Sequence, residues 1–297
     1  MGELTIDRFH LKANASFCIR EGWLTKGLLN VQKDAAVFTN EEAAIRKLGI
    51  GSAMVKSLRN WMQISGLTVE QKTGKRMQYL TEVGKLISER DPYFEDPFSL
   101  CYIHYHIVTN KELATVWFLL FNYSDMVRFT KAEMYEELIG QFKQMTDKEF
   151  SPKSFEDDCS TALKTYASDD VKQLSPEDNM QCPLVSLSLF TKTAKGYYEK
   201  TVPPADMLPA SAIHYVIMEN ANGQEGVSME KLLSEPCNVG RVFHLTPYRL
   251  NVYLDELQSM GALEIQRTAG LNMIYPGKKS SYEIAKDYYY GRNMNNE

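Results

Sequence analysis

Helical spacing of apolar residues is clearest in the first quarter of the chain. Residues 39–49 form a predicted helix, with Thr39 or Asn40 as its N-terminal cap and Gly49 at its end. A tight turn leads to a second predicted helix, residues 52–66, whose apolar stripe recurs at i, i+4 and i+7: Met54, Leu58 and Trp61. The opposite face carries side chains of the types that reach phosphates and base edges: Lys56, Arg59, Asn60 and Gln63.

Two segments with strand-like alternation follow, residues 67–71 and 76–80, around the turn KTGK. Basic side chains gather at the tip of this predicted hairpin: Lys72, Lys75 and Arg76. Helix, turn, helix and basic hairpin is the order of a winged helix, so the pattern predicts a DNA-binding unit, with Ser52 as the cap of its second helix. Winged helices also hold protein partners, and a polar helix face is often only solvated, so an adaptor is the alternative.

A second unit with the same order of elements is predicted between residues 205 and 276. Its last helix begins at Thr246 and Pro247 and buries one apolar stripe: Leu250, Tyr253, Leu254 and Leu257. Asp255 and Glu256 lie on the exposed side, where acidic groups repel phosphate. We therefore expect this unit to pack against another domain, a partner or a second copy in a homodimer. Contact with a DNA backbone is the alternative for three basic side chains: Arg241, His244 and Arg249.

The middle of the chain is richer in acids and aromatics. Four helices are predicted there, followed by a hairpin over residues 183–202 that turns at TAKG; the helices cover residues 96–110, 111–124, 130–144 and 151–167. The fold class is therefore mainly α with small β-hairpins. The expected domains are a winged helix with an N-terminal G-W-L-x-K-G segment, a central helical domain and a C-terminal winged helix: residues 1–90, 91–204 and 205–297.

Composition and charge narrow the function. The chain carries a net charge of −5, yet residues 1–80 hold twelve Lys and Arg against seven Asp and Glu, a net +5. The basic end is where a phosphate backbone would bind. No apolar run is long enough to span a membrane, which predicts a cytoplasmic protein. The five cysteines lack zinc-site spacing, and the chain has no nucleotide-binding, zinc-protease or serine-hydrolase motif.

One dense group of acids and imidazoles lies in the central segment: Asp91, Glu95, Asp96, His104 and His106. Such side chains can hold a divalent ion for phosphodiester cleavage, so Mg²⁺ or Mn²⁺ is the candidate cofactor. The alternative is structural, because Asp-Pro starts helices and turns. In a helix, His104 and His106 would lie about 200° apart and could not bind one ion together. No residue is assigned a catalytic role.

The stretch REGWLTKGL, residues 20–28, has two interpretations. As a ligand loop, Trp23 would be a stacking platform and Arg20 and Lys26 would clamp an anion. As a brace, Trp23 would pack beneath the helices while its neighbouring glycines allow close backbone approach. Its position just before the first predicted winged helix favours the brace. Arg20 and Lys26 remain candidates for contact with the DNA backbone.

Four stretches within residues 9–140 resemble a bacterial domain-of-unknown-function family of DNA phosphorothioation operons: FCIREGWLTKGL, RKLGIGSAMVKSLRNWMQISGL, DPYFEDPFSLCYIHYHI and ATVWFLLFN. Members of this family lie beside a cysteine desulfurase, an ATP-pyrophosphatase-like sulfur-transfer enzyme and an ATPase. One member, the B component of the Ssp system, is a DNA nickase. The resemblance implies a protein that binds duplex DNA, and nicks it with a divalent metal, in a complex with sulfur-transfer and ATPase proteins.

Two positions depart from the family pattern. A His-Glu pair often precedes the Arg-x-Gly-Trp-Leu stretch, whereas Asn14 and Ala15 stand here; the turn that is commonly Gly-Lys-Asn is here Gly51-Ser52-Ala53. The first change removes two metal-binding or acid–base groups and the second removes one cation, so nicking loses more support than DNA binding does. The resulting hypothesis is a DNA-binding subunit of a phosphorothioation defence system. The alternative is a non-catalytic adaptor or a transcription-factor-like protein.

Overall fold

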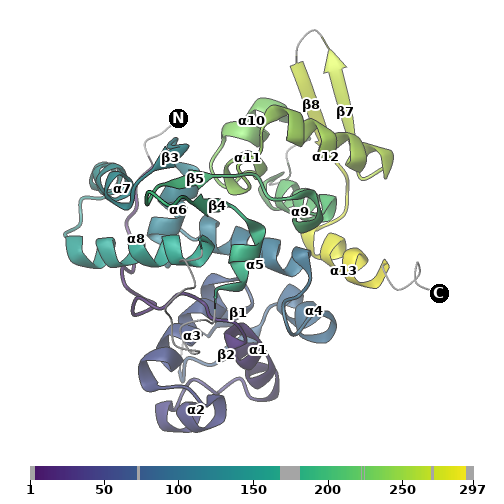
Figure 1. Cartoon of the computed structure of the whole chain (residues 1–297). Helices are drawn as coiled ribbons and strands as arrows, with labels where there is room; N and C mark the ends of the chain where they lie inside the picture. Colours follow the sequence, from purple (N-terminus) through teal and green to yellow (C-terminus); the bar gives the residue numbers. More distant parts are fainter. Residues whose placement is uncertain are drawn as a thin grey trace.

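The N-terminal part of the molecule consists of helices and one antiparallel strand pair (Figure 1). The structure is a computed structural model that describes residues 4–71, 74–167, 181–221, 223, 225–268 and 271–291. The elements of this part are α1 Trp23–Lys33, α2 Glu41–Leu48, α3 Ser52–Ile64, β1 Thr68–Glu70, β2 Gln78–Leu80 and α4 Glu82–Arg90. Strands β1 and β2 pair with Thr68 opposite Leu80. Helix α1 packs against α2, α3, α4 and β2, so these elements share one core.

The local helix signals hold in this part of the chain. The Asn40 side chain accepts a hydrogen bond from the Ala43 amide at the start of α2, and Gly49 ends the helix with a φ of 65°. The predicted cap at Ser52 is shifted by one residue, because Gly51 occupies the cap position and the Ser52 hydroxyl instead donates to Glu41.

The middle of the molecule is built around two helices that are buried on nearly all sides, as their continuous apolar sequence predicts. Its helices are α5 Pro97–Thr109, α6 Thr115–Asn122, α7 Lys131–Met145, α8 Pro152–Tyr166 and the 3₁₀ segments η1 Pro183–Leu187 and η2 Ala205–Met207. A small sheet joins β3 Arg128–Phe129, β5 Tyr198–Lys200 and β4 Phe190–Lys192 in that order. The predicted hairpin is therefore confirmed only for residues 190–200, since Pro183 opens a 3₁₀ turn.

The C-terminal part resembles the N-terminal one, with helices followed by an antiparallel strand pair and a last helix, but it adds a two-residue strand and one short helix. It contains α9 Ala210–Ala221, β6 Val227–Ser228, α10 Met229–Ser234, α11 Val239–Val242, α12 Pro247–Ser259, β7 Leu263–Thr268, β8 Leu271–Pro276 and α13 Ser281–Gly291. Strands β6, β8 and β7 form an antiparallel sheet in that order. The Thr246 hydroxyl caps α12, as predicted.

Helix α13, which the sequence pattern did not reveal, joins the C-terminal part to the rest of the molecule. It packs against both α9 and α4, beside the start of α5 (Figure 1). The Tyr289 and Ser99 hydroxyls form a hydrogen bond of 2.6 Å, and the Tyr288 hydroxyl donates to Asp96 at 2.8 Å. These contacts give the C-terminal helix a fixed place against the centre of the chain.

The predicted fold class, mainly α with small antiparallel hairpins, is confirmed. The division at residues 90 and 204 stays a prediction. Among the residues that the structure describes, no helix has the length and apolar character needed to cross a membrane.

Candidate nucleic-acid interface

The polar face of α3, formed by Lys56, Arg59, Asn60 and Gln63, is the candidate DNA surface. Lys56 is the most accessible of the four, because its side chain is 65% exposed. Its ammonium group lies 3.1 Å from the Glu41 carboxylate on α2. The Ser52 hydroxyl donates to the same carboxylate, so Ser52 is held at the start of the helix. An exposed ion pair of this kind is weak and can open for a phosphate.

Glu70 on β1 accepts hydrogen bonds from three other polar side chains of this surface. One oxygen of its carboxylate accepts from Arg59 Nη2 at 2.5 Å and from Gln63 Nε2 at 3.2 Å. The other oxygen accepts from Arg76 Nε at 2.6 Å. Burial by itself raises the pKa of Glu70, but the hydrogen bonds from the two arginines outweigh it and hold that pKa below its usual value. Arg59, Gln63 and Arg76 are thus bonded inside the protein.

The N-terminal segment covers the remaining part of the polar face. The Asn60 amide donates to the Ala13 carbonyl at 2.5 Å, and the Trp61 indole donates to the Phe17 carbonyl at 2.9 Å. Asn60 and Trp61 therefore hold Ala13 and Phe17 against α3, and the Asn60 amide is already engaged. No local sequence pattern predicts this contact, because Asn60 and Ala13 are 47 residues apart.

Near the strand pair, Lys75 and Arg76 are both exposed. Among the described residues Lys75 forms no ion pair, whereas Arg76 bonds to Glu70. Lys72, the third residue of the predicted basic tip, lies outside the described residues.

The stretch around Trp23 is a brace, as its position in the sequence indicated. Trp23 opens α1 and is buried, and a Cβ added at Gly27 would lie 2.5 Å from the Met62 sulfur, so a side chain there would require Met62 to shift. The Arg20 guanidinium lies over the rings of Phe17 and Trp23, at 5.8 and 5.6 Å from their centroids. Lys26 is exposed on α1 and forms no ion pair with a described residue.

The acidic candidates for metal binding organise the turn before α5. Asp91 is buried and accepts from the amides of Glu95 and Asp96 and, at 2.5 Å, from the Ser99 hydroxyl. Burial raises its pKa despite these bonds. Asp96 caps α5 through the Phe98 amide, at 2.8 Å. Glu95 is exposed. These are the contacts of a helix-capping turn.

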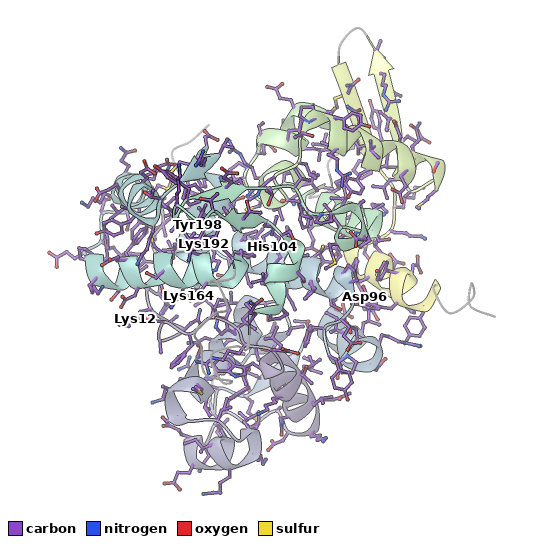
Figure 2. All side chains as sticks on the ribbon, viewed as in Figure 1. Lys12, Asp96, His104, Lys164, Lys192 and Tyr198 are labelled. Atoms are coloured by element: carbon purple, nitrogen blue, oxygen red, sulfur yellow. The ribbon has the colours of Figure 1, made fainter. Side chains whose placement is uncertain are left out.

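The two histidines of α5 point to different neighbours. His104 is fully buried, with Nδ1 2.8 Å from the Tyr166 hydroxyl and Nε2 2.7 Å from the Val242 carbonyl. His106 contacts the Tyr215 hydroxyl at 3.3 Å. Burial lowers the pKa of each to about 4, so both are neutral near pH 7. Figure 2 shows His104 in the middle of the molecule and Asp96 beside α13.

These five residues do not fit a divalent-metal site in this arrangement. The structure brings together the acids of the turn, but it places His104 and His106 among separate partners. No group of three or more His, Cys, Asp or Glu side chains that could hold a metal occurs among the residues that the structure describes. We therefore derive no metal-dependent step from them.

The basic side chains of the C-terminal part hold elements together. Arg241 pairs with Asp125 at 2.6 Å, and Arg249 donates to the Pro203 carbonyl at 3.4 Å. The His244 ring stacks on Phe121, with centroids 5.0 Å apart. All three therefore bind the middle of the molecule to α11 and α12.

The sequence analysis did not single out two carboxylates that the structure shows to be well bonded. Glu70 is the first, and Asp158 on α8 is the second. Asp158 is buried, accepts from the Lys12 amide at 2.8 Å, and has a pKa that burial raises to about 6. The nearby Asn14, which stands where the family pattern has His, is buried as well. Neither carboxylate lies in a local motif, so no sequence signal marks them.

Together, the fold and this surface describe a multi-helical protein with a basic helix–turn–helix and hairpin unit at its N-terminal end. The chain belongs to the family described as protein of unknown function (DUF4007), which matches residues 13–289. Two similar solved structures are described as "SspB crystal structure" and "Magnesium ion-bound SspB crystal structure". Each is 23% identical to this chain and superposes with a TM-score of 0.83. The match covers 99% of this chain and 90% of the SspB chain. No curated protein matches. The family resemblance of the sequence is thereby confirmed.

Proposed function

We propose that the chain is a DNA-binding component of a bacterial DNA phosphorothioation system. In this proposal the N-terminal unit, α1–α4 with β1 and β2, is a winged helix that contacts duplex DNA. The observation that carries the proposal is the charge of this unit, a net +5 over residues 1–80 in a chain of net −5, with exposed lysines on α3 and beside β2. Membership of the family and a fold shared with SspB support the pathway.

The exposed lysines make the first contacts with phosphate in this scheme. Lys56, Lys75 and Lys26 are accessible, and only Lys56 has an ion-pair partner among the described residues. The other candidates contact DNA when their bonds within the protein open: Arg20, Ser52, Arg59, Asn60, Gln63 and Arg76. Because phosphate contacts position a protein without reading sequence, the lysines account for affinity and not for specificity.

Replacing Lys56 and Lys75 by Ala tests the interface. Each lost phosphate contact should reduce the slope of log K against log salt by about 1 and weaken duplex binding at low salt. Fluorescence anisotropy with a labelled duplex, over a range of salt concentrations, measures both. Lys143→Ala is the matched control, since Lys143 is an exposed lysine on α7. If the double variant binds as the wild type does, the N-terminal unit is not the DNA surface.

Nicking with Mg²⁺ or Mn²⁺ is the finer hypothesis, and no residue of the chain is assigned to it. Conversion of supercoiled plasmid to open circle, with the sulfur-transfer and ATPase proteins present, is the measurement that separates a nickase from a non-catalytic subunit.

The second candidate function is that of an adaptor, and α12 favours it. Tyr248 and Val252 lie one turn apart on this helix, and the Tyr248 side chain is 75% exposed. Asp255 and Glu256 lie on the same helix and disfavour phosphate. In this scheme the C-terminal unit, a second winged helix, contacts a sulfur-transfer or ATPase protein or a second copy of the chain. Absence of any duplex binding by the wild type would favour this function over the first.

A further inference from the structure

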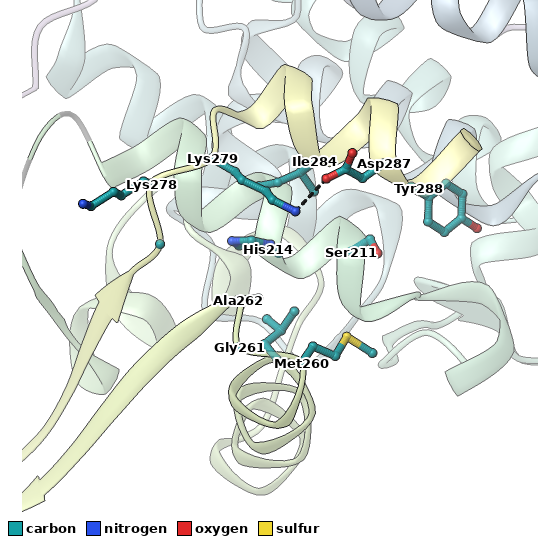
Figure 3. Close-up of a pocket in the computed structure, with 12 residues that line it drawn as sticks. Ser211, His214, Met260, Gly261, Ala262, Lys278, Lys279, Ile284, Asp287 and Tyr288 are labelled. Atoms are coloured by element: carbon teal, nitrogen blue, oxygen red, sulfur yellow. Dashed lines mark hydrogen bonds and ion pairs between the residues drawn. The ribbon is translucent and has the colours of Figure 1, made fainter. Parts of the chain in front are cut away.

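A cavity of about 400 Å³ lies between α13 and the other elements of the C-terminal part (Figure 3). Its walls come from α9, the end of α12, the turn into β7, the link between β8 and α13, and α13 itself. The volume lies within the range of sites that bind small molecules. None of the residues that line the cavity belongs to the candidate DNA surface.

One buried polar side chain in the wall lacks a partner. His214 on α9 is only 5% exposed, and its buried Nε2 atom has no hydrogen-bond partner among the residues that the structure describes. Burial, and then the charge of Lys279, lowers the pKa of His214 to about 4, so the ring is neutral near pH 7. A neutral imidazole has one N–H donor and one acceptor. Buried polar groups are almost always bonded, so this ring is unusual.

Cations outnumber acids around the opening. Lys279 reaches across to Asp287 on α13 at 2.7 Å, and Lys278 points away from the other labelled side chains (Figure 3). Both partners of the Lys279–Asp287 pair are more than half exposed, so the pair is weak and Lys279 can turn to another anion. Lys279 lines the cavity, and its ammonium group, once turned away from Asp287, favours an anionic ligand over a cation.

Much of the remaining wall is apolar, although Ser211 and Tyr288 also line it. Leu257 and Met260 from α12 and its end face Ile284 of α13 across the cavity. Binding here would remove an apolar group from water, and the polar groups would orient the charged end.

We propose that this cavity is a binding site for a small organic anion. Its apolar body rests on Leu257, Met260 and Ile284, and its carboxylate or phosphate lies beside Lys279 and His214. Because α13 also packs against α4, an occupant would contact both the C-terminal unit and the helix that joins it to the N-terminal part.

Calorimetric titration of the full chain with octanoate and with phenyl phosphate tests the site, and the two probes distinguish a carboxylate from a phosphate ligand. Octanol and benzyl alcohol are the neutral controls. At least one acid should bind, and Lys279→Met should weaken it about tenfold by removing a charge-assisted hydrogen bond. Asp287→Asn should strengthen binding several-fold, because it frees Lys279.

Lys286→Met on α13 is the matched control, since Lys286 is an exposed lysine that does not line the cavity. It changes the net charge equally and should leave binding unchanged. The proposal is overturned if neither acid binds, if Lys279→Met binds as tightly as the wild type, or if the alcohols bind as tightly as the acids. Because Lys279 is exposed, its replacement should not disturb the fold. An unchanged midpoint of thermal unfolding in Lys279→Met shows that the variant is folded.

Discussion

At the scale of single residues, Glu70 decides how the candidate DNA surface is organised. Its side chain is 11% exposed and accepts hydrogen bonds from both arginines of the surface and from Gln63. The Glu70 carboxylate binds the same guanidinium groups that a DNA phosphate would bind. Glu70 also links α3 to the strand pair, so it combines a structural contact with competition for the cations.

Glu70→Gln should therefore raise the affinity for duplex DNA and steepen its salt dependence by about 1 to 2 in slope, because Arg59 and Arg76 are released to phosphate. The change should also lower stability, since the mostly buried Arg59 side chain loses its charged partner. Anisotropy titrations at several salt concentrations and urea unfolding measure the two effects.

The matched control for that change is Glu82→Gln, which removes an equally charged, exposed side chain at the start of α4. Unchanged DNA affinity in Glu70→Gln would mean that the carboxylate has a structural role alone. Weaker binding would mean that Glu70 positions Arg59 for DNA, which also contradicts competition.

At the scale of elements, glycines of the same local type have opposite roles. Gly84 in α4 and Gly140 in α7 are both helical. A Cβ added at Gly84 would lie 2.3 Å from the Leu67 carbonyl oxygen, whereas at Gly140 nothing lies within 4 Å. Helix α4 can therefore pack this closely against the Leu67 backbone, just before β1, only because residue 84 lacks a side chain.

Gly84→Ala should lower the free energy of unfolding by about 1 to 3 kcal/mol, the usual cost of overpacking against an atom that cannot move aside. Gly140→Ala, the matched control, should raise it by up to about 1 kcal/mol through helix propensity. Urea unfolding of both variants is the measurement. Equal effects of the two substitutions would contradict the packing account.

The elements that sequence predicted are those with local signals. Asn40, Thr130 and Thr246 cap α2, α7 and α12, and each cap was visible as a polar residue before an apolar stripe. Helix α13 was missed, because Tyr289 and Tyr288 are held by contacts with Ser99 and Asp96, almost two hundred residues away. The two-residue strand β3 was missed for a related reason, since only its pairing with β5 defines it.

At the scale of the whole molecule, four histidines are held in the neutral form: His104 and His214 are buried, and His106 and His244 are partly buried. Burial lowers the pKa of His104, His106 and His214 to about 4 and that of His244 to about 3. His104 on α5 bonds to the Val242 carbonyl, and His244, just before α12, bonds to the Thr201 carbonyl, so these rings link separate elements. The unfolded chain, in which a histidine titrates near 6.5, binds protons that the folded chain excludes.

Stability should therefore fall as the pH decreases from about 6.5 towards 4, by up to about 1.4 kcal/mol per pH unit for each such histidine. Asp158, whose pKa is raised to about 6, acts in the opposite direction over part of this range, because the folded chain binds its proton more readily. Urea unfolding at pH 7.5 and pH 5 measures the balance. A free energy of unfolding that is unchanged or higher at pH 5 would show that the histidines are not held neutral.

The amino-acid sequence by itself determined the mainly helical class, the helix–turn–helix order, the basic N-terminal charge and the family, because these depend on composition and on residues within a few turns of one another. Only the tertiary structure decided which polar side chains of α3 are free. Arg59 and Glu70 are 11 residues apart, and Asn60 and Ala13 are 47 apart. Such bonds depend on where packing places β1 and the N-terminal segment, and helical periodicity carries no information about those distances.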